Sequence, residues 1–368
     1  MKNLIKLMAL SISCWLAGTA ALAAEDTPTI NFAGRIQADH TRYDGGKYPY
    51  ADGSEVRRLR AGFGGNLTSA WEYRVEYDFA PDDPEVKDIY FRYTGFTNTR
   101  ITLGNFKVFS SLDELTSSNN TTFAERGLPN ALVTARRTAI GYQTWSDNYS
   151  FSAATYTHEP NNLERGTGNA ARFVYHPKLG NGALLHLAVN AAIEKPDDKT
   201  ARLRSRPEMH QDDHRIIDTR TLVGVDNTTK LGLEAAYTLN RWSVQGEYIR
   251  KSISRKNASD PSFDGYYAYI SYFLTNDTRA YTNSEGIFGT VAPAADTGAW
   301  EIAARFSDLD LNDGTISGGQ ADAITLAVNY YMTRDLRFQA NYVFTDSKGG
   351  TVLGDDPNGL QLRVRLTW

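Results

Sequence analysis

Charged residues occupy every second position of the segment WEYRVEYDF (Trp71–Phe79). Two of its carboxylates, Glu72 and Glu76, could serve as the acid and base of a glycosidase. Alternation places Glu72, Arg74, Glu76 and Asp78 on one face of an extended strand, because successive side chains point to opposite sides. A row that mixes both charges indicates a polar sheet surface better than a catalytic pair.

Other catalytic or cofactor chemistry has little support. His210, Asp212, Asp213 and His214 offer metal-ligand types, but His-x3-His spacing brings two imidazoles together only on a helix, and this tract next to Pro207 is predicted to be a solvated loop. We find neither a G-x-S-x-G nucleophile elbow nor a phosphate-binding P-loop. The sequence therefore predicts no metal, no cofactor and no enzyme activity.

The composition narrows the class of protein. Beyond residue 24 the chain carries 37 basic and 43 acidic residues, which argues against a nucleic-acid-binding protein. Hydrophobic content is 41%, yet aromatics reach 12% with 21 tyrosines, as expected of a barrel with an aromatic girdle and a wet interior. Beyond residue 24 no run of about 18 apolar residues predicts a membrane helix.

Sixteen period-2 segments separated by turn residues can be read along the chain. We expect strands at 28–43, 56–68, 70–80, 86–96, 99–108, 135–146, 149–158, 170–178, 183–195, 229–239, 242–255, 263–275, 298–311, 321–333, 336–347 and 359–368. Short links alternate with longer polar ones, and the longest irregular stretches are 109–134 and 196–228. An even strand number with short turns on one rim is typical of an all-β, 16-stranded antiparallel transmembrane β-barrel.

The two ends of the chain agree with this prediction. Residues 1–24 have the layout of a secretory signal peptide, with cleavage after Ala23 or Ala24, which leaves a single domain at 25–368. The only cysteine, Cys14, leaves with it. The closing segment LQLRVRLTW (Leu360–Trp368) alternates apolar and polar residues and ends on an aromatic. Its arginines should face an aqueous interior, because a lipid-facing Arg costs roughly 2–4 kcal/mol at mid-membrane.

Two other strands sort by face in the same way. Leu59, Phe63 and Leu67 oppose Arg58 and Arg60. In the strand 298–311, Trp300, Ile302 and Phe306 oppose Glu301 and Arg305. A soluble secreted β-sandwich would give a similar pattern strand by strand. The strand number, the aromatic end and the signal peptide together favour the membrane barrel.

The chain resembles the phosphate- and polyphosphate-selective porin family of Gram-negative outer membranes. The resemblance spans essentially the whole mature chain. The matching segments include GRIQADHTRYDG (Gly34–Gly45), VRRLRAGFGGNL (Val56–Leu67), LDELTSSNNTTFAERGLP (Leu112–Pro129), RLRSRPEM (Arg202–Met209) and GAWEIAARFSDLDLN (Gly298–Asn312). The resemblance implies a homotrimer of barrels, each with a pore constricted by an inward-folded third loop at 109–134.

The resemblance also implies which residues line the pore. Arginines of this family replace the hydration shell of a passing anion, and their planar guanidinium groups suit phosphate oxygens. The matching positions are Arg35, Arg57 and Arg58 on the first two strands and Arg202, Arg204 and Arg206 in the fifth loop. Strand alternation adds Arg60 and Arg74 to this anion-binding set but sends Arg57 outward, so Arg57 needs a bulge or a position above the membrane. The alternative for each arginine is a structural ion pair with a carboxylate of the barrel interior.

The expected constriction loop departs from the family pattern. Its predicted site residues are Asp113, Glu114, Ser117, Ser118, Asn119, Glu125 and Arg126. Phosphate-selective members carry lysines at positions matching Glu114 and Asn119, whereas Ser110 to Glu125 contains no Lys or Arg. An anion should bind less well at a loop that has lost these positive charges. At 6 Å and an effective dielectric of about 20, each change of one charge alters the interaction energy with the anion by on the order of 3 kcal/mol.

We therefore expect an outer-membrane porin, exported through the periplasm, in contact with outer-membrane lipid and lipopolysaccharide. It would be a passive channel for small hydrophilic solutes, with a preference for inorganic or organic anions such as phosphate or polyphosphate. The alternatives are a general or weakly cation-selective porin and a structural outer-membrane barrel.

Overall fold

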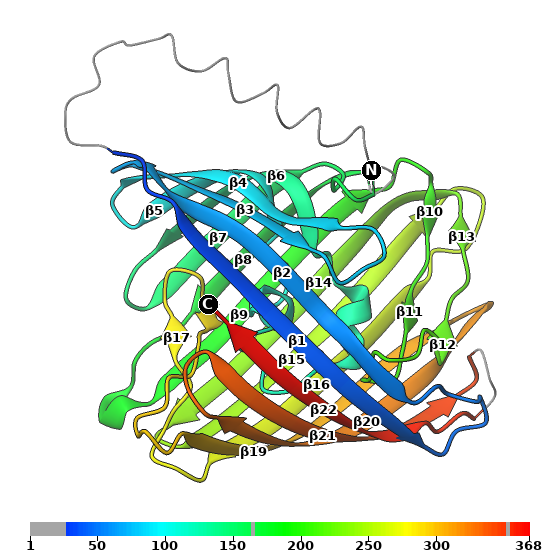
Figure 1. Ribbon diagram of the computed structural model, residues 1–368. Coiled ribbons are helices and arrows are strands. Elements are labelled where there is room, and N and C mark those ends of the chain that lie inside the picture. The colour runs from blue at the N-terminus through cyan, green and yellow to red at the C-terminus, as the bar shows by residue number, and fades with distance from the viewer. Residues whose placement is uncertain (1–26, 163–165, 351–353) are drawn as a thin grey trace, which may run out of the picture.

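Sixteen antiparallel strands close into one barrel in the computed structural model, which describes residues 27–162, 166–350 and 354–368 (Figure 1). Each wall strand pairs with the next along the chain, and the last pairs with the first to complete the ring. The wall strands are β1 (Asn31–Asp44), β2 (Gly53–Thr68), β3 (Trp71–Asp78), β4 (Glu85–Phe96), β5 (Thr99–Lys107), β6 (Arg136–Trp145), β7 (Tyr149–Tyr156), β8 (Thr167–Tyr175), β9 (Leu184–Lys195), β14 (Val225–Leu239), β15 (Trp242–Arg255), β16 (Ser262–Phe273), β19 (Ala299–Asp313), β20 (Ile316–Tyr331), β21 (Leu336–Lys348) and β22 (Asn358–Thr367).

The predicted barrel and all sixteen predicted strands are confirmed, and the expected signal peptide lies outside the described residues. The wall alternates as predicted. On β22, Leu362 and Val364 are exposed on the outside, whereas Arg363 and Arg365 are buried inside. An apolar outer face around a charged interior is the pattern expected of a barrel surrounded by lipid and filled with water and ion pairs. Among the described residues, no helix is long and apolar enough to span a membrane.

A β-bulge lies at Arg57. Gln37 of β1 pairs with Arg58, and the next residue, Ala38, pairs with Val56, so Arg57 is the extra residue of β2. A bulge of this kind re-aims one side chain without ending the ladder. It is the feature that strand alternation required for Arg57 to reach the interior.

The connections differ between the two rims. We call the rim where the backbones of Gly34 and Trp368 pair the chain-end rim. Its links are short, as predicted, except for the segment 274–298 between β16 and β19, which we call the rim segment. The opposite rim carries 108–135, which we call the inward loop, and the long connection 196–224.

Short elements occur within these connections. The inward loop contains helix α2 (Leu112–Leu115) and the 3-10 helix η1 (Leu128–Leu132), and a second 3-10 helix, η3 (Gly180–Gly182), lies in a chain-end turn. The long connection contains β10 (Thr200–Ala201), β11 (Arg204–Ser205), β12 (Ile217–Asp218) and β13 (Leu222–Val223), and the rim segment contains β17 (Tyr281–Thr282) and β18 (Ile287–Phe288). The largest apolar cluster joins η1 to the long connection and to β15, β16, β19, β20 and β21.

Candidate functional site

The inward loop lies inside the barrel, where inward-facing side chains bind its backbone. Arg337 of β21 donates to the carbonyl oxygens of Thr121 at 2.8 Å and Thr122 at 3.0 Å. Gln37 of β1 donates to the carbonyl of Ser118 at 3.2 Å. Each bond satisfies a loop carbonyl that has no backbone partner in the wall strands. The loop is therefore fixed against the wall of β1, β22 and β21.

The rim segment enters the same interior from the chain-end rim. Arg172 of β8 donates to the carbonyls of Glu285 at 2.9 Å and Gly286 at 2.8 Å. The hydroxyl of Thr290 then donates to the side-chain oxygen of Asn120 at 3.0 Å. Two segments from opposite rims therefore meet within the barrel. Sequence analysis did not foresee this entry, because it assigned only the loop 109–134 to the interior.

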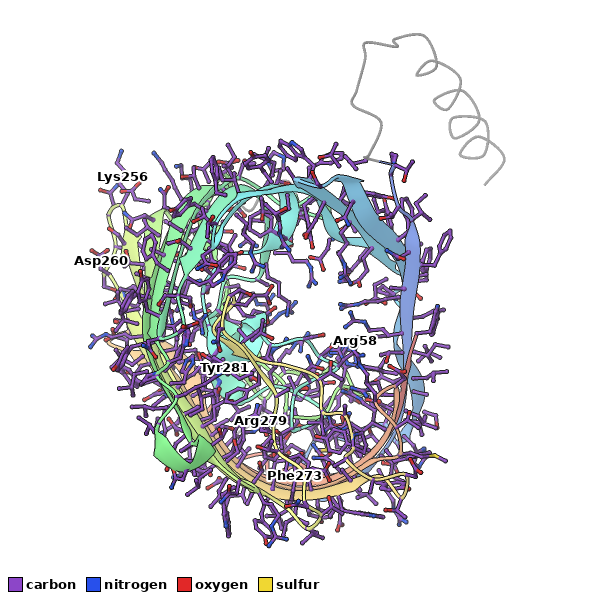
Figure 2. The ribbon with its side chains drawn as sticks, turned by 90° about the vertical axis from the view of Figure 1, so that its left-hand side faces the viewer. Arg58, Lys256, Asp260, Phe273, Arg279 and Tyr281 are labelled. Carbon is purple, nitrogen blue, oxygen red and sulfur yellow. The ribbon has the colours of Figure 1, made fainter. Side chains whose placement is uncertain are left out.

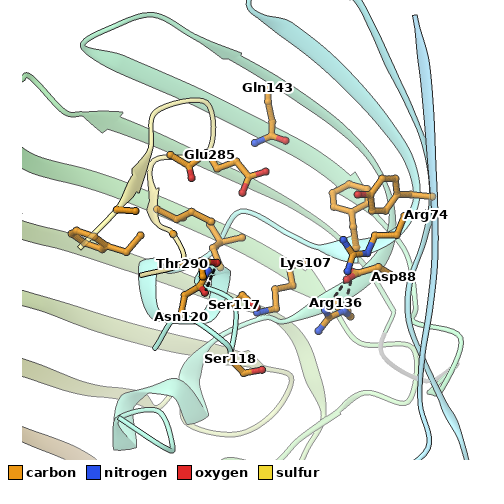
Figure 3. A pocket seen from close by; sticks show the side chains of 18 of the residues that line it. Arg74, Asp88, Lys107, Ser117, Ser118, Asn120, Arg136, Gln143, Glu285 and Thr290 are labelled. Atoms are coloured by element: carbon orange, nitrogen blue, oxygen red, sulfur yellow. Dashed lines mark hydrogen bonds and ion pairs between the residues drawn. The ribbon is translucent and has the colours of Figure 1, made fainter. Parts of the chain in front are cut away.

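A cavity of about 570 Å³ lies between these two segments and the wall of β1 to β6. Looking along the barrel, Figure 2 shows open space toward that side and crowded side chains around Tyr281, Arg279 and Phe273. The basic residues that line the cavity are Arg35, Arg60, Arg74, Arg92, Arg100, Lys107, Arg136 and Arg334, and its acidic lining residues are Asp88 and Glu285. In Figure 3, Arg74, Asp88 and Arg136 lie on one side of this space, and Asn120, Thr290 and Glu285 lie on the other.

Ion pairs hold the basic wall of the cavity in place. Glu76 accepts from Arg35 at 3.3 Å and from Arg74 at 2.7 Å, and its other oxygen lies 3.4 Å from Arg60. Arg136 makes a two-bond contact with Asp88 at 3.0 Å. Arg60 also donates to Asp78 at 2.8 Å, so two carboxylates serve these three guanidinium groups and a surplus of one positive charge remains at this wall. The side chain of Arg74 remains 40% exposed, so it presents donors to the cavity.

The structure separates the predicted arginines into three groups. Arg35, Arg60 and Arg74 line the cavity. Arg57 and Arg58 instead face Glu125 of the inward loop, Arg57 at 2.9 Å and 3.0 Å and Arg58 at 3.9 Å.

The third group lies in the long connection and takes no part in lining the cavity. Arg202 pairs with Asp218, and Arg206 pairs with Asp213. Arg204 is exposed on β11. The structure therefore does not bring these three arginines together with Arg35, Arg60 and Arg74.

Glu114 and Glu125 of the inward loop are counter-ions within the barrel. Burial alone would raise the pKa of Glu114, but Arg126 and Lys107 outweigh it and lower that pKa to about 2. Burial is likewise outweighed at Glu125, where Arg57, Arg363 and Arg58 hold the pKa well below its usual range. Burial raises the pKa of Asp113. Local cations therefore offset the negative charges of Glu114 and Glu125.

The remaining predicted loop residues hold the loop to the wall and to itself. Ser117 and Ser118 each accept from Arg35 at 3.3 Å. The carbonyl of Asn119 accepts from Arg365. Arg126 donates to the carbonyl oxygens of Glu114 in α2 at 3.1 Å and of Thr116 just after it at 3.0 Å. Ser117 and Ser118 also line the cavity.

Five basic cavity residues were missed by the sequence reasoning: Arg92, Arg100, Lys107, Arg136 and Arg334. Strand alternation could have identified Arg92, because it lies within a predicted strand two positions from Tyr90, another lining residue, and so on the same face. Lys107 and Arg136 sit at strand ends, where the boundary of the long loop was uncertain. Within the described ranges, no group of three or more His, Cys, Asp or Glu residues could hold a metal ion, and His210 instead lies 2.9 Å from Glu55.

Comparison with known proteins identifies relatives of nearly the full chain. The family model described as "Phosphate-selective porin O and P" matches residues 30–368. A protein of Caulobacter vibrioides is 30% identical over 357 residues, which cover 90% of this chain and 71% of that protein. Porin O of Pseudomonas aeruginosa is 27% identical over 390 residues, which cover 92% of this chain and 88% of its own length.

Solved structures share the fold at low identity. The anion-selective porin of Comamonas acidovorans superposes with a TM-score of 0.61 at 14% identity and covers 93% of this chain and 100% of that chain. The outer-membrane protein OmpT of Vibrio cholerae gives a TM-score of 0.61 at 14% identity, with 95% of this chain and 100% of that chain covered. These similarities establish the architecture of the barrel.

Proposed function

The chain belongs to the phosphate-selective porin O and P family and is an outer-membrane porin, and from this premise we propose that it is a passive channel with a preference for small anions such as phosphate or polyphosphate. The observation that carries the proposal is the charge of the cavity lining, where eight basic residues face two carboxylates. Four further carboxylates behind the lining pair with these basic residues, namely Glu72, Glu76, Asp78 and Glu114, and the balance remains positive. A narrow aqueous passage with low-dielectric walls focuses such a field and concentrates anions within it.

Arg74 and Arg35 would make the main contacts with a passing anion. Arg74 keeps donors beyond its ion pair with Glu76 and is the more exposed of the two. Arg35 also donates to Ser117 and Ser118, which line the cavity with it. Guanidinium groups replace the hydrogen bonds that an oxyanion loses with its hydration shell. Since the groups are spread along the wall, an anion can move between them without being trapped.

The inward loop and the rim segment would together form the constriction. Their contact at Asn120 and Thr290 spans the interior between opposite rims. Arg57, Arg58, Arg363 and Arg365 would act on permeation indirectly, by fixing the inward loop. Arg202, Arg204 and Arg206 would attract anions at the opposite rim before they enter.

The proposed partners follow from the same assignment. The apolar outer face contacts outer-membrane lipid and lipopolysaccharide, with the chain-end rim in the periplasm. We include a homotrimer in the proposal, because OmpT of Vibrio cholerae, which shares the fold with a TM-score of 0.58, is described in a trimer form. No catalytic step and no cofactor are needed for diffusion along a concentration gradient.

The test is the reversal potential of the purified protein in planar lipid bilayers under a KCl gradient, with phosphate then added as a blocker. We expect a potential of the sign that anion permeation gives, together with a phosphate-dependent loss of chloride current. A potential of the opposite sign would refute the proposal and leave a weakly cation-selective or general porin. An anion-selective channel without phosphate block would refute only the preference for phosphate.

A further inference from the structure

Apolar residues line the cavity beside its basic wall. Phe106 of β5 and Phe109 of the inward loop lie 6.0 Å apart between ring centroids, and Tyr90 meets Phe106 edge-on at 6.5 Å. Leu115 packs against this group and also against Ile287 and Phe288 of the rim segment. All six residues line the cavity, so an apolar strip runs from β4 to the rim segment. Phe106, Phe109, Ile287 and Phe288 are buried behind it, and Tyr90 and Leu115 are its half-buried, open part.

Exposed alanines extend the strip toward the open space. Ala280 and Ala292 line the cavity on the rim segment and are exposed, and Leu115 is half-buried. The segment that carries them also carries Thr290 and Glu285, which Figure 3 shows across the open space from Arg74 and Arg136. Arg92 lies over the ring of Tyr90 at 4.6 Å and Arg279 over the ring of Phe288 at 3.6 Å, so guanidinium groups lie directly beside the hydrocarbon of the strip.

A fully hydrated inorganic anion gains no binding energy from the apolar strip. When an apolar group covers this hydrocarbon, the binding free energy improves by roughly 25 cal/mol for each Å² of apolar surface removed from water. A solute with an anionic end and a compact apolar body can contact the basic wall and the apolar strip at once, with its charge on Arg74 or Arg35 and its body on the strip.

We propose that the cavity binds small amphiphilic organic anions, of the class of aromatic or branched monocarboxylates, more tightly than short carboxylates of equal charge. The inference rests on the proposed anion channel and adds a substrate class to it. Contact with the strip removes about 60 Å² of a benzene ring from water, which corresponds to about a tenfold gain in affinity.

The test compares benzoate with acetate as blockers of KCl current through the full-length protein in planar bilayers. Both carry one carboxylate, so the ratio of their half-blocking concentrations isolates the apolar contribution. We expect benzoate to block at about one tenth of the acetate concentration. Equal half-blocking concentrations in an anion-selective channel would overturn this inference and leave the proposed function intact. A cation-selective reversal potential would overturn the proposed function and this inference with it.

Two variants locate the effect in the strip. Ile287→Thr keeps the branched shape and adds a hydroxyl, and Leu115→Gln keeps the length of the side chain. Each should bring the benzoate-to-acetate ratio to within about threefold. The matched control is Ile316→Thr, on the opposite rim in the large apolar cluster, which should keep the wild-type ratio. A wild-type ratio in both strip variants would place benzoate elsewhere and overturn the assignment, and the wild-type comparison stands even if one variant does not fold.

Discussion

Arg57 and Glu125 form a two-bond ion pair, at 2.9 Å and 3.0 Å, between the bulge of β2 and the inward loop. Glu125 also accepts from Arg363 of β22 at 2.6 Å, and Arg363 in turn pairs with Asp39. The bulge thus gives the loop carboxylate a contact that a regular strand would not offer. Because Arg57 and Glu125 are 15–17% exposed, little solvent competes with the pair.

Removing the charge of Glu125 should release the inward loop. Glu125→Gln keeps the shape of the side chain but leaves Arg57 and Arg363 without their shared counter-ion. Loss of one partner of a buried pair costs about 3 kcal/mol. We expect a lower unfolding temperature and larger fluctuations of the open-channel current. Asp226→Asn, at an exposed position of β14, is the matched control, and equal current noise in the two variants would contradict the anchoring role.

Acid should weaken the same loop at Glu114. Its pKa in the folded protein is lowered to about 2 from an ordinary value of 4.5, so the ion pairs contribute their full stability above pH 4.5 and lose it as the pH falls toward 2. The contribution is on the order of 3 kcal/mol. Single-channel conductance should therefore be constant from pH 7 to about 4.5 and become irregular below that. The Glu114→Gln variant should lack this transition, and an identical acid profile in variant and wild type would exclude Glu114 as its origin.

The fold could be predicted further than the site because alternation is a local signal. Each wall strand shows its two faces in its own sequence, as Arg363 and Leu362 do. The bulge at Arg57 was foreseen as one of two ways for this residue to reach the interior, since the face of Arg58 was already fixed. The entry of the rim segment was not foreseen, because its anchors on Arg172 and Asn120 are far apart in the sequence.

The contact between Thr290 and Asn120 should set the width of the passage. Thr290→Val is nearly isosteric and removes only the hydroxyl that donates to Asn120 at 3.0 Å. Loss of one such bond costs about 1 kcal/mol, so the barrel should remain folded while the two inward segments separate more often. We expect a higher mean conductance and unchanged anion preference. Thr155→Val, whose hydroxyl bonds Asn169 on the outer face, is the control, and equal conductance in both variants would rule out the contact as a determinant of width.

Arg74 should contribute directly to anion binding, because its guanidinium is the most exposed of the three that Glu76 serves. Arg74→Gln removes the charge, while Arg35 and Arg60 still neutralise Glu76, so the wall should fold. We expect about a tenfold rise in the half-blocking concentration of phosphate, equivalent to about 1.4 kcal/mol, and a reversal potential closer to zero.

Two further variants separate charge from geometry at this position. Arg74→Lys keeps the charge but loses the planar pair of donors, so its loss of phosphate block should be smaller than that of Arg74→Gln. Arg250→Gln, on β15 outside the lumen, removes the same charge from an exposed position and should leave the block unchanged. If Arg74→Gln and Arg250→Gln gave the same phosphate block, the surplus charge at Glu76 would not be where the anion binds.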